Sequence, residues 1–264
     1  MNNGPIGIFD SGVGGLTVFR EISRFFPHED IIYFGDTARV PYGSKSSDTI
    51  HRFAIEDINF LKRQKVKVIV VACNTASAVL LELKKKFNLP LVNVIQPGIK
   101  EALFYSKNKR IGVIGTESTI RSRAYQRLLR RYNPSVKIFS QACPLFVSLI
   151  EENWVKRKET KLIVKRYLSV LKDKGIDTLI LGCTHYPLFK PLIQKEMGKK
   201  VKLVDSARAV AKELKNVFKE NGLPLKEKGQ PKYKFFVSDL PPKFRKIGER
   251  FLGKKLGKIQ LHHL

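Results

Sequence analysis

The sequence predicts an α/β fold, because strand-like apolar runs alternate along the 264-residue chain with helix-like segments. Two of these runs, residues 68–72 and 178–182, are aliphatic and show no alternation with polar residues. Such runs are typical of strands buried on both faces of a parallel sheet. The pattern also starts again near residue 99. We therefore expect two pseudo-symmetric lobes, each a mainly parallel sheet between two layers of helices.

The first lobe begins with four expected strands, at residues 6–9, 31–34, 68–72 and 91–95. A Gln-Pro-Gly turn at residues 96–98 is expected to end the fourth strand. The helices between the strands are expected at residues 14–26, at residues 47–62 with Ser46 or Ser47 as the cap, and from the third strand through about residue 87.

The second lobe repeats this order of elements. Ile6-Gly7 in the first strand recurs 105 residues later at Ile111-Gly112, and Cys73 recurs 110 residues later at Cys183. Residues 203–206 fall near the place where residues 94–97 would recur. Similar offsets at three places favour a duplicated lobe.

The C-terminal part of the chain is too small to cover an apolar face alone. It contains an expected helix at residues 208–219, a Gly/Pro/Lys-rich link at residues 221–232, a strand at residues 233–237 and a closing helix from residue 242. A piece of this size needs a neighbour. We therefore expect a discontinuous first lobe, residues 1–98 plus 208–264, and a second lobe at residues 99–207.

The charge of the chain is strongly positive, with 50 Lys and Arg against 23 Asp and Glu, a formal net charge of +27. The basic excess lies beyond residue 60. Nucleic-acid binding is one interpretation, because clustered Lys and Arg neutralise phosphates. A solvated basic surface that attracts small anions is the other. No RNA-recognition motif or zinc finger is present in the sequence, which favours the second interpretation.

Three cysteines, an odd number, argue against a disulfide framework and indicate a reducing compartment. No apolar stretch reaches the roughly 18 residues that a membrane-spanning helix needs. The N-terminus lacks the basic and apolar regions of a signal peptide. We therefore predict a cytoplasmic protein with no membrane partner.

Two of the cysteines occupy nearly the same setting. Cys73 ends one buried strand and is followed by Asn74 and Thr75, whereas Cys183 ends another and is followed by Thr184 and His185. Ligands bind at the carboxyl ends of strands in open parallel sheets. The alternative is that each thiol is a small inert core residue, but two such settings favour a functional pair.

A zinc site is a second alternative for these thiols, with Cys143 and His185 completing the ligands. The sequence has no C-x2-C pair, and Cys183 and His185 do not have a usual zinc-ligand spacing, so we expect no metal. Cys143 precedes Pro144 and is expected to be a packed turn residue. Other candidates look ordinary alone: a surface His51, a solvated Glu151-Glu152 pair, a turn at residues 41–43 and a frayed tail at residues 262–263.

A glycine-rich segment, residues 10–15, follows the first strand and opens a helix. Its glycines allow close approach of the backbone, and the amides at a helix N-terminus favour a bound carboxylate or phosphate. The spacing matches neither the dinucleotide fingerprint nor a Walker loop. A plain strand-to-helix turn remains possible, although Asp10 at its start points to function.

Five segments in order resemble the signature of bacterial glutamate racemases. They are residues 8–18 (IFDSGVGGLTV), 35–43 (GDTARVPYG), 72–77 (ACNTAS), 142–146 (ACPLF) and 181–187 (LGCTHYP). The resemblance continues through residues 204–206 and, more weakly, 235–251, so it covers nearly the whole chain. The chain departs from the family pattern at Ser148, where proline is usual, and at Asn153, where glycine is usual.

The resemblance implies a cofactor-independent enzyme that interconverts L- and D-glutamate in a cleft between the lobes and supplies D-glutamate for peptidoglycan. By analogy, Cys73 acts on the D-enantiomer and Cys183 on the L-enantiomer. Asp10, His185 and Glu151 would assist the thiols. The resemblance also implies a homodimer. The groups expected to hold the substrate are Asp10, Ser11, Tyr42, Gly43, Asn74, Thr75, Thr184 and His185.

Racemisation removes the α-proton from one face of the substrate and returns a proton to the other, so two groups are needed. One must start as thiolate and the other as thiol, and a free thiol titrates near ~8.5, so each needs a proton partner. A pyridoxal enzyme would instead need a Schiff-base lysine, and no lysine lies at a strand-end site. A related racemase acting on aspartate or another acidic amino acid is the alternative within enzymes.

Overall fold

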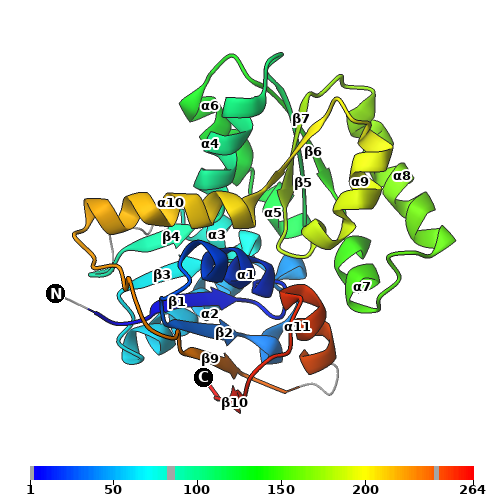
Figure 1. Ribbon diagram of the computed structural model, residues 1–264. Helices are drawn as coiled ribbons and strands as arrows, with labels where there is room; N and C mark the ends of the chain where they lie inside the picture. The colour runs from blue at the N-terminus through cyan, green and yellow to red at the C-terminus, as the bar shows by residue number, and fades with distance from the viewer. Residues whose placement is uncertain (1–2, 82–86, 241–243) are drawn as a thin grey trace.

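The computed structural model describes residues 3–81, 87–240 and 244–264 and contains two parallel sheets (Figure 1). The first sheet has the order β10-β9-β2-β1-β3-β4. Its strands are β1 (Ile6–Asp10), β2 (Ile31–Gly35), β3 (Val68–Val71), β4 (Leu91–Asn93), β9 (Tyr233–Val237) and β10 (Ile259–Leu261). The C-terminal strands thus join the sheet that the N-terminus begins, and β10 was not expected from the sequence.

The second sheet has the order β6-β5-β7-β8. Its strands are β5 (Arg110–Gly115), β6 (Lys137–Ala142), β7 (Thr178–Gly182) and β8 (Lys202–Asp205). This order matches β2-β1-β3-β4 of the first sheet, and the strand pairs in both sheets are parallel. The expected fold class of two repeated α/β lobes is therefore confirmed, and Cys73 and Cys183 follow equivalent strands, β3 and β7.

Helices flank both sheets (Figure 1). In the first part of the chain they are α1 (Leu16–Phe25), α2 (Ser47–Arg63), α3 (Asn74–Val79) and α4 (Ile95–Tyr105). In the second lobe they are α5 (Glu117–Arg121), α6 (Ala124–Tyr132), α7 (Leu145–Glu151), α8 (Lys158–Lys172) and α9 (Lys190–Met197), followed by α10 (Ser206–Glu220) and α11 (Phe244–Leu252). Helix α2 begins where predicted, because the Ser46 side chain accepts a hydrogen bond from the Thr49 amide.

The expected turn at residues 96–98 is wrong, because these residues belong to α4. The Asn93 side chain accepts hydrogen bonds from the amides of Ile95 and Gln96 and so caps the helix. Pro97 lies in the first turn, where its missing N–H costs nothing. Because the helix begins so early, the strand ends at Asn93. Gly98 has no side chain and so leaves room for Ser206 on the facing helix α10.

The expected frayed tail at residues 262–263 is also wrong in part. Strand β10 precedes it, and the His262 amide donates to the Val237 carbonyl at 2.8 Å. The His262 ring packs on Phe60, with the ring centroids 4.4 Å apart. Helix α3 ends at Val79, and the expected continuation of that helix over residues 82–86 and the expected start of the closing helix at residues 242–243 lie outside the described residues.

One hydrophobic cluster extends through both lobes. It joins Phe19 and Tyr33 of the first lobe to Phe146 and Tyr186 of the second, all buried. Such a continuous core fixes the two sheets relative to each other. Within the described residues, no helix is long and apolar enough to cross a membrane.

Candidate active site

A cavity of about 300 Å³ lies where the carboxyl ends of the central strands of both sheets meet. Ser11 follows β1 and Cys73 follows β3, whereas Thr116 follows β5 and Cys183 follows β7. The cavity therefore receives two strand ends from each lobe. Its wall is formed by Ser11, Gly12, Val40, Pro41, Tyr42, Gly43, Ser44, Cys73, Asn74, Thr75, Thr116, Glu117, Pro144, Val147, Ser148, Glu151, Cys183, Thr184 and His185.

Cys73 sits at the N-cap of α3, two residues after the end of β3. Its Sγ accepts a hydrogen bond from the Ala76 amide at 3.5 Å and lies 3.6 Å from the Ser11 hydroxyl oxygen. Burial raises the pKa of the Cys73 thiol to about 12, and the charge of Asp10 adds to the rise. Cys73 is therefore a thiol at neutral pH.

Asp10 is fully buried beneath this wall. Its two carboxyl oxygens accept hydrogen bonds from lining residues, Oδ2 from the Gly12 amide at 3.0 Å and Oδ1 from the Thr184 hydroxyl at 3.4 Å. Burial raises the pKa of Asp10, although the nearby His185 and the hydrogen bonds oppose the rise. Asp10 thus links the first lobe to the Cys183 loop and influences Cys73 by its charge.

Cys183 lies beside an imidazole that is itself paired with a carboxylate. His185 Nδ1 is 3.9 Å from the Cys183 Sγ, and His185 Nε2 is 2.8 Å from Glu151 Oε1. Burial alone would lower the pKa of His185, but the hydrogen bonds and charges of Cys183 and Glu151 outweigh burial and raise it to about 10. His185 is therefore a cation at neutral pH.

Helix α11 contacts the His185–Glu151 pair from the side of the first lobe. Arg250 Nη2 donates to the carbonyl oxygens of Ile150 at 3.2 Å and Glu151 at 2.8 Å, the last residues of α7. A cation at a helix C-terminus is favourable. The Phe251 ring packs edge-on against His185, with centroids 5.0 Å apart.

The two departures from the family pattern lie next to this pair. Asn153 has a φ of 62°, a left-handed conformation that asparagine tolerates better than most residues, which fits a position where the family usually has glycine. Ser148 is exposed on α7 and lines the cavity. The alternative of a merely solvated Glu151 does not describe this side chain, because its carboxylate is partly exposed but pairs with His185.

The polar residues after Cys73 connect the lobes. Asn74 Nδ2 donates to the Tyr125 hydroxyl at 2.8 Å, and the buried Asn74 Oδ1 has no hydrogen-bond partner. The Thr75 hydroxyl lies 3.0 Å from that of Thr116 and 3.1 Å from that of Thr119. Because a buried, unsatisfied amide oxygen is costly, Asn74 Oδ1 is available to accept from a ligand.

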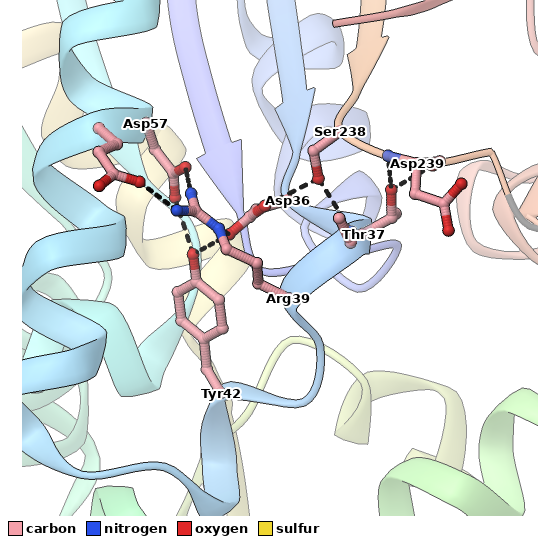
Figure 2. A network of polar contacts seen from close by, with 9 residues as sticks. Asp36, Thr37, Arg39, Tyr42, Asp57, Ser238 and Asp239 are labelled. Carbon is pink, nitrogen blue, oxygen red and sulfur yellow. Dashed lines mark hydrogen bonds and ion pairs between the residues drawn. The ribbon is translucent and has the colours of Figure 1, made fainter. Parts of the chain in front are cut away.

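Tyr42 and Gly43 form another part of the wall, but the Tyr42 hydroxyl is turned away from solvent into a buried network (Figure 2). It hydrogen-bonds to Asp36 Oδ2 and to Asp57 Oδ2. Gly43 is required for close packing, since a Cβ there would lie 2.8 Å from the Cβ of Thr116 in the other lobe. The segment therefore meets the second lobe through its backbone.

The glycine-rich segment brings the lobes together. A Cβ on Gly14 would lie 2.3 Å from Thr184 Oγ1 and 2.5 Å from His185 Nδ1, and a Cβ on Gly15 would lie 2.4 Å from the Asp10 Cβ. Both contacts are impossible for any larger residue. The missing side chain at Gly14 therefore leaves room for the loop that carries Cys183.

Every residue that the sequence nominated is near the cavity: all but Asp10 line it, and Asp10 bonds to two residues that do. Sequence reasoning missed Thr116. The signal was present, because the offset of 105 that relates Ile6 to Ile111 also relates Ser11 to Thr116. Arg250 could not be found that way, since α11 belongs to the unrepeated C-terminal part.

Cys143 is buried as a packed residue, as expected. Its Sγ lies 3.8 Å from the Gln141 carbonyl oxygen, its own carbonyl accepts from the Tyr186 hydroxyl, and burial raises its pKa. Among the residues that the structure describes, no group of three or more His, Cys, Asp or Glu side chains has an arrangement able to hold a metal ion.

The fold and site match one protein family. Residues 6–214 match the model of the Asp/Glu/hydantoin racemase family. The chain belongs to this family, and it is an enzyme of the isomerase class.

Within that family the chain is similar to glutamate racemases. It is 50% identical to the glutamate racemase of Geobacter metallireducens over 96% of this chain and 94% of that protein, and 49% identical to that of Neisseria meningitidis over 97% and 96%. The crystal structure of Francisella tularensis glutamate racemase in complex with D-glutamate superposes with a TM-score of 0.93 at 42% identity, covering 99% of this chain and 98% of that one.

Proposed function

We propose that this chain interconverts L- and D-glutamate with two cysteines and no cofactor. The observation that carries the proposal is the placement of Cys73 and Cys183. The two thiols come from equivalent strand ends of the two lobes and line one cavity. Relatives that are about half identical over nearly the whole chain are glutamate racemases, which supports glutamate as the substrate.

The protonation of the groups around Cys73 and Cys183 favours a resting state that is ready for L-glutamate. Cys73 holds its proton, and Cys183 faces the cationic His185. In the L-to-D direction, Cys183 as thiolate removes the α-proton of L-glutamate, and the Cys73 thiol gives its proton to the opposite face. The D-to-L direction runs the same two transfers in reverse. An L-to-D turnover leaves Cys73 as thiolate and Cys183 as thiol, so before the next one Asp10 assists the return of a proton to Cys73 and His185 assists the loss of one from Cys183.

The developing negative charge at the α-carbon needs stabilisation by fixed groups. The substrate amino and carboxylate groups would be held by Ser11, Gly43, Asn74, Thr75 and Thr184, whose donors and acceptors face the cavity wall from both lobes. The orphan Asn74 Oδ1 suits the ammonium group. Oriented donors in a site that excludes water supply the stabilisation.

The proposal is tested by incubating the enzyme with each enantiomer of glutamate in heavy water without added cofactor. Loss of circular dichroism, with deuterium entering the α-position of the product, is expected from both sides. If L-glutamate keeps its optical activity while L-aspartate loses it, the substrate is the shorter acid. Full activity only after addition of pyridoxal phosphate would contradict the cofactor-free mechanism.

We further propose the biological setting that follows from this activity. D-Glutamate would enter peptidoglycan, and three free thiols fit a cytoplasmic enzyme. We propose lobe boundaries of 1–98 plus 208–264 and 99–207, a homodimer, and a basic surface that attracts the dicarboxylate rather than nucleic acid. Sedimentation tests the dimer, and filter binding over a salt series tests nucleic acid.

A further inference from the structure

Behind Tyr42 lies a polar network that contains two fully buried carboxyl groups and one guanidinium (Figure 2). Asp36 follows β2, and Asp57 lies on α2. Arg39 joins them, with Nε donating to Asp36 Oδ2 at 2.6 Å and Nη2 donating to Asp57 Oδ1 at 3.1 Å. Arg39 also pairs with the partly exposed Glu56 and covers the Phe53 ring.

The Tyr42 hydroxyl sits between the two carboxyl groups and cannot satisfy both as a donor. It contacts Asp36 Oδ2 and lies 3.1 Å from Asp57 Oδ2. A phenol has one proton and can donate to one oxygen only. If both acids were ionised, one carboxylate oxygen would face the phenol oxygen with no proton between them. One of the two acids must therefore carry a proton.

The other contacts decide which acid carries it. Asp36 accepts from Ser238 Oγ at 2.8 Å on Oδ1 and from Arg39 Nε on Oδ2, so both its oxygens already act as acceptors. Asp57 accepts from Arg39 on Oδ1, and its Oδ2 meets only the phenol oxygen among the hydrogen bonds of the described residues. The free position for a proton is Asp57 Oδ2.

We propose that Asp57 is a positioning residue that remains protonated and donates to the Tyr42 oxygen, while Tyr42 donates to the ionised Asp36. This chain of hydrogen bonds orients the segment at residues 41–43 against the cavity and the second lobe. The consequence for substrate binding rests on the proposed function, whereas the location of the proton does not.

The charges around Asp57 agree with this assignment. Burial raises the pKa of Asp57, and the neighbouring Asp36 raises it further, against the opposing effect of Arg39. With Asp57 neutral, Arg39 balances Asp36 inside the protein and Glu56 at its edge. With Asp57 ionised, a second fully buried carboxylate would compete for the same guanidinium.

The test compares two replacements of Asp57. Asp57→Asn keeps the pattern, because the amide Nδ2 donates to Tyr42 and Oδ1 accepts from Arg39. Asp57→Leu removes both contacts at similar volume. We expect KM for both glutamate enantiomers to stay near the wild-type value in Asp57→Asn and to rise by on the order of tenfold in Asp57→Leu, the usual effect of an orphaned buried hydrogen bond. An Asp57→Asn variant as impaired as Asp57→Leu overturns the proposal, and so does a normal KM in Asp57→Leu.

Infrared spectroscopy locates the proton without any need for activity. The wild-type protein at neutral pH should show the carbonyl stretch of a protonated carboxylic acid, and the difference spectrum against Asp57→Asn should contain that band. A difference spectrum with only carboxylate bands overturns the assignment. A wild-type enzyme that shows the band but does not racemise glutamate would refute the proposed function and leave the proton on Asp57.

Discussion

The surroundings of Cys73 and Cys183 differ more than the strands that carry them. Each thiol follows the equivalent strand of its own sheet, β3 or β7, and both line one cavity. Cys73 caps a helix and has a hydroxyl neighbour, Ser11, with the charge of Asp10 nearby. Cys183 instead faces His185, which is paired with Glu151.

This difference shows that the repeat places the thiols but does not supply their proton partners. Asp10 is the last residue of β1, whose equivalent in the second lobe is β5, but Gly115 occupies the corresponding position there. Glu151 is oriented by Arg250 from the unrepeated α11. A duplicated lobe can therefore place two thiols at one cavity and still surround them differently, with a carboxylate near Cys73 and an imidazolium beside Cys183.

The largest expected effect follows from removing either thiol. Cys73→Ala and Cys183→Ala should each lower kcat for racemisation by at least about 10³-fold in both directions, because each turnover needs one base and one acid. The change of circular dichroism with time, starting from each enantiomer, measures this loss. Cys143→Ala is the control, since Cys143 packs in the core and should keep near-wild-type activity. Substantial activity in Cys73→Ala or Cys183→Ala would contradict the hypothesis that racemisation needs both thiols.

Replacing Asp10 or His185, the proposed proton partners of the two thiols, should affect the two reaction directions differently. Because enantiomers have equal free energies in water, kcat/KM must fall equally in both directions for any variant. The two directions can still differ in kcat and in KM when each constant is considered separately. Asp10→Asn should lower kcat by about 10²-fold mainly from D-glutamate, and His185→Asn mainly from L-glutamate. Full progress curves from both enantiomers give the constants, and identical patterns in the two variants would contradict separate partners.

Much of this comparison was readable in the sequence. Aliphatic runs ending in Cys73 and Cys183 predicted buried parallel strands, and the similar offsets predicted the repeated sheet order, because both features depend on local composition. The turn expected at residues 96–98 failed because Asn93 caps a helix there and Gly98 packs on α10. The contact between Gly98 and Ser206 joins residues that are far apart in the chain, and a local sequence pattern cannot predict it.

The site was predictable to the same extent. The thiols and their polar neighbours follow strand ends, so the sequence nominated them. The direction of the Tyr42 hydroxyl, toward Asp36 and Asp57 rather than the cavity, depends on a helix that packs across β2 and was not foreseen. Neither was Arg250, whose contact with Glu151 spans 99 positions.

A smaller effect should follow from weakening the cation beside Cys183. Contacts with Cys183 and Glu151 raise the pKa of His185 to about 10 from its ordinary value of 6.5, despite burial. Glu151→Gln removes the negative charge from one of these contacts, so the alkaline limb of the kcat profile should move to lower pH, with kcat at neutral pH reduced by about tenfold. Glu159→Gln, an exposed change on α8, should leave the profile in place. An unmoved alkaline limb in Glu151→Gln would argue that Glu151 does not support the imidazolium.

The same pair should contribute to stability over a defined pH range. Because the folded-state pKa of His185 lies above the unfolded value, its stabilisation is fully present below about 6.5 and is lost as the pH rises through about 10. The difference in unfolding free energy between wild type and Glu151→Gln should therefore shrink as the pH is raised across this range. Urea unfolding at several pH values measures it, and a constant difference would contradict the linkage.

The smallest expected effect concerns Arg250, which acts on the Cys183 side only. Arg250→Met keeps the packing of the stem but removes the donors to the Ile150 and Glu151 carbonyls, so Glu151 should hold His185 less firmly. We expect kcat to fall by about threefold and the alkaline limb to shift in the direction seen for Glu151→Gln, with about 1 kcal/mol lost in stability. Arg245→Met removes a comparable bond from the same helix to the Leu256 carbonyl and should cost stability without moving the limb. Equal pH profiles for the two arginine variants would mean that α11 merely covers the site, and that the asymmetry between the thiols is set within the second lobe.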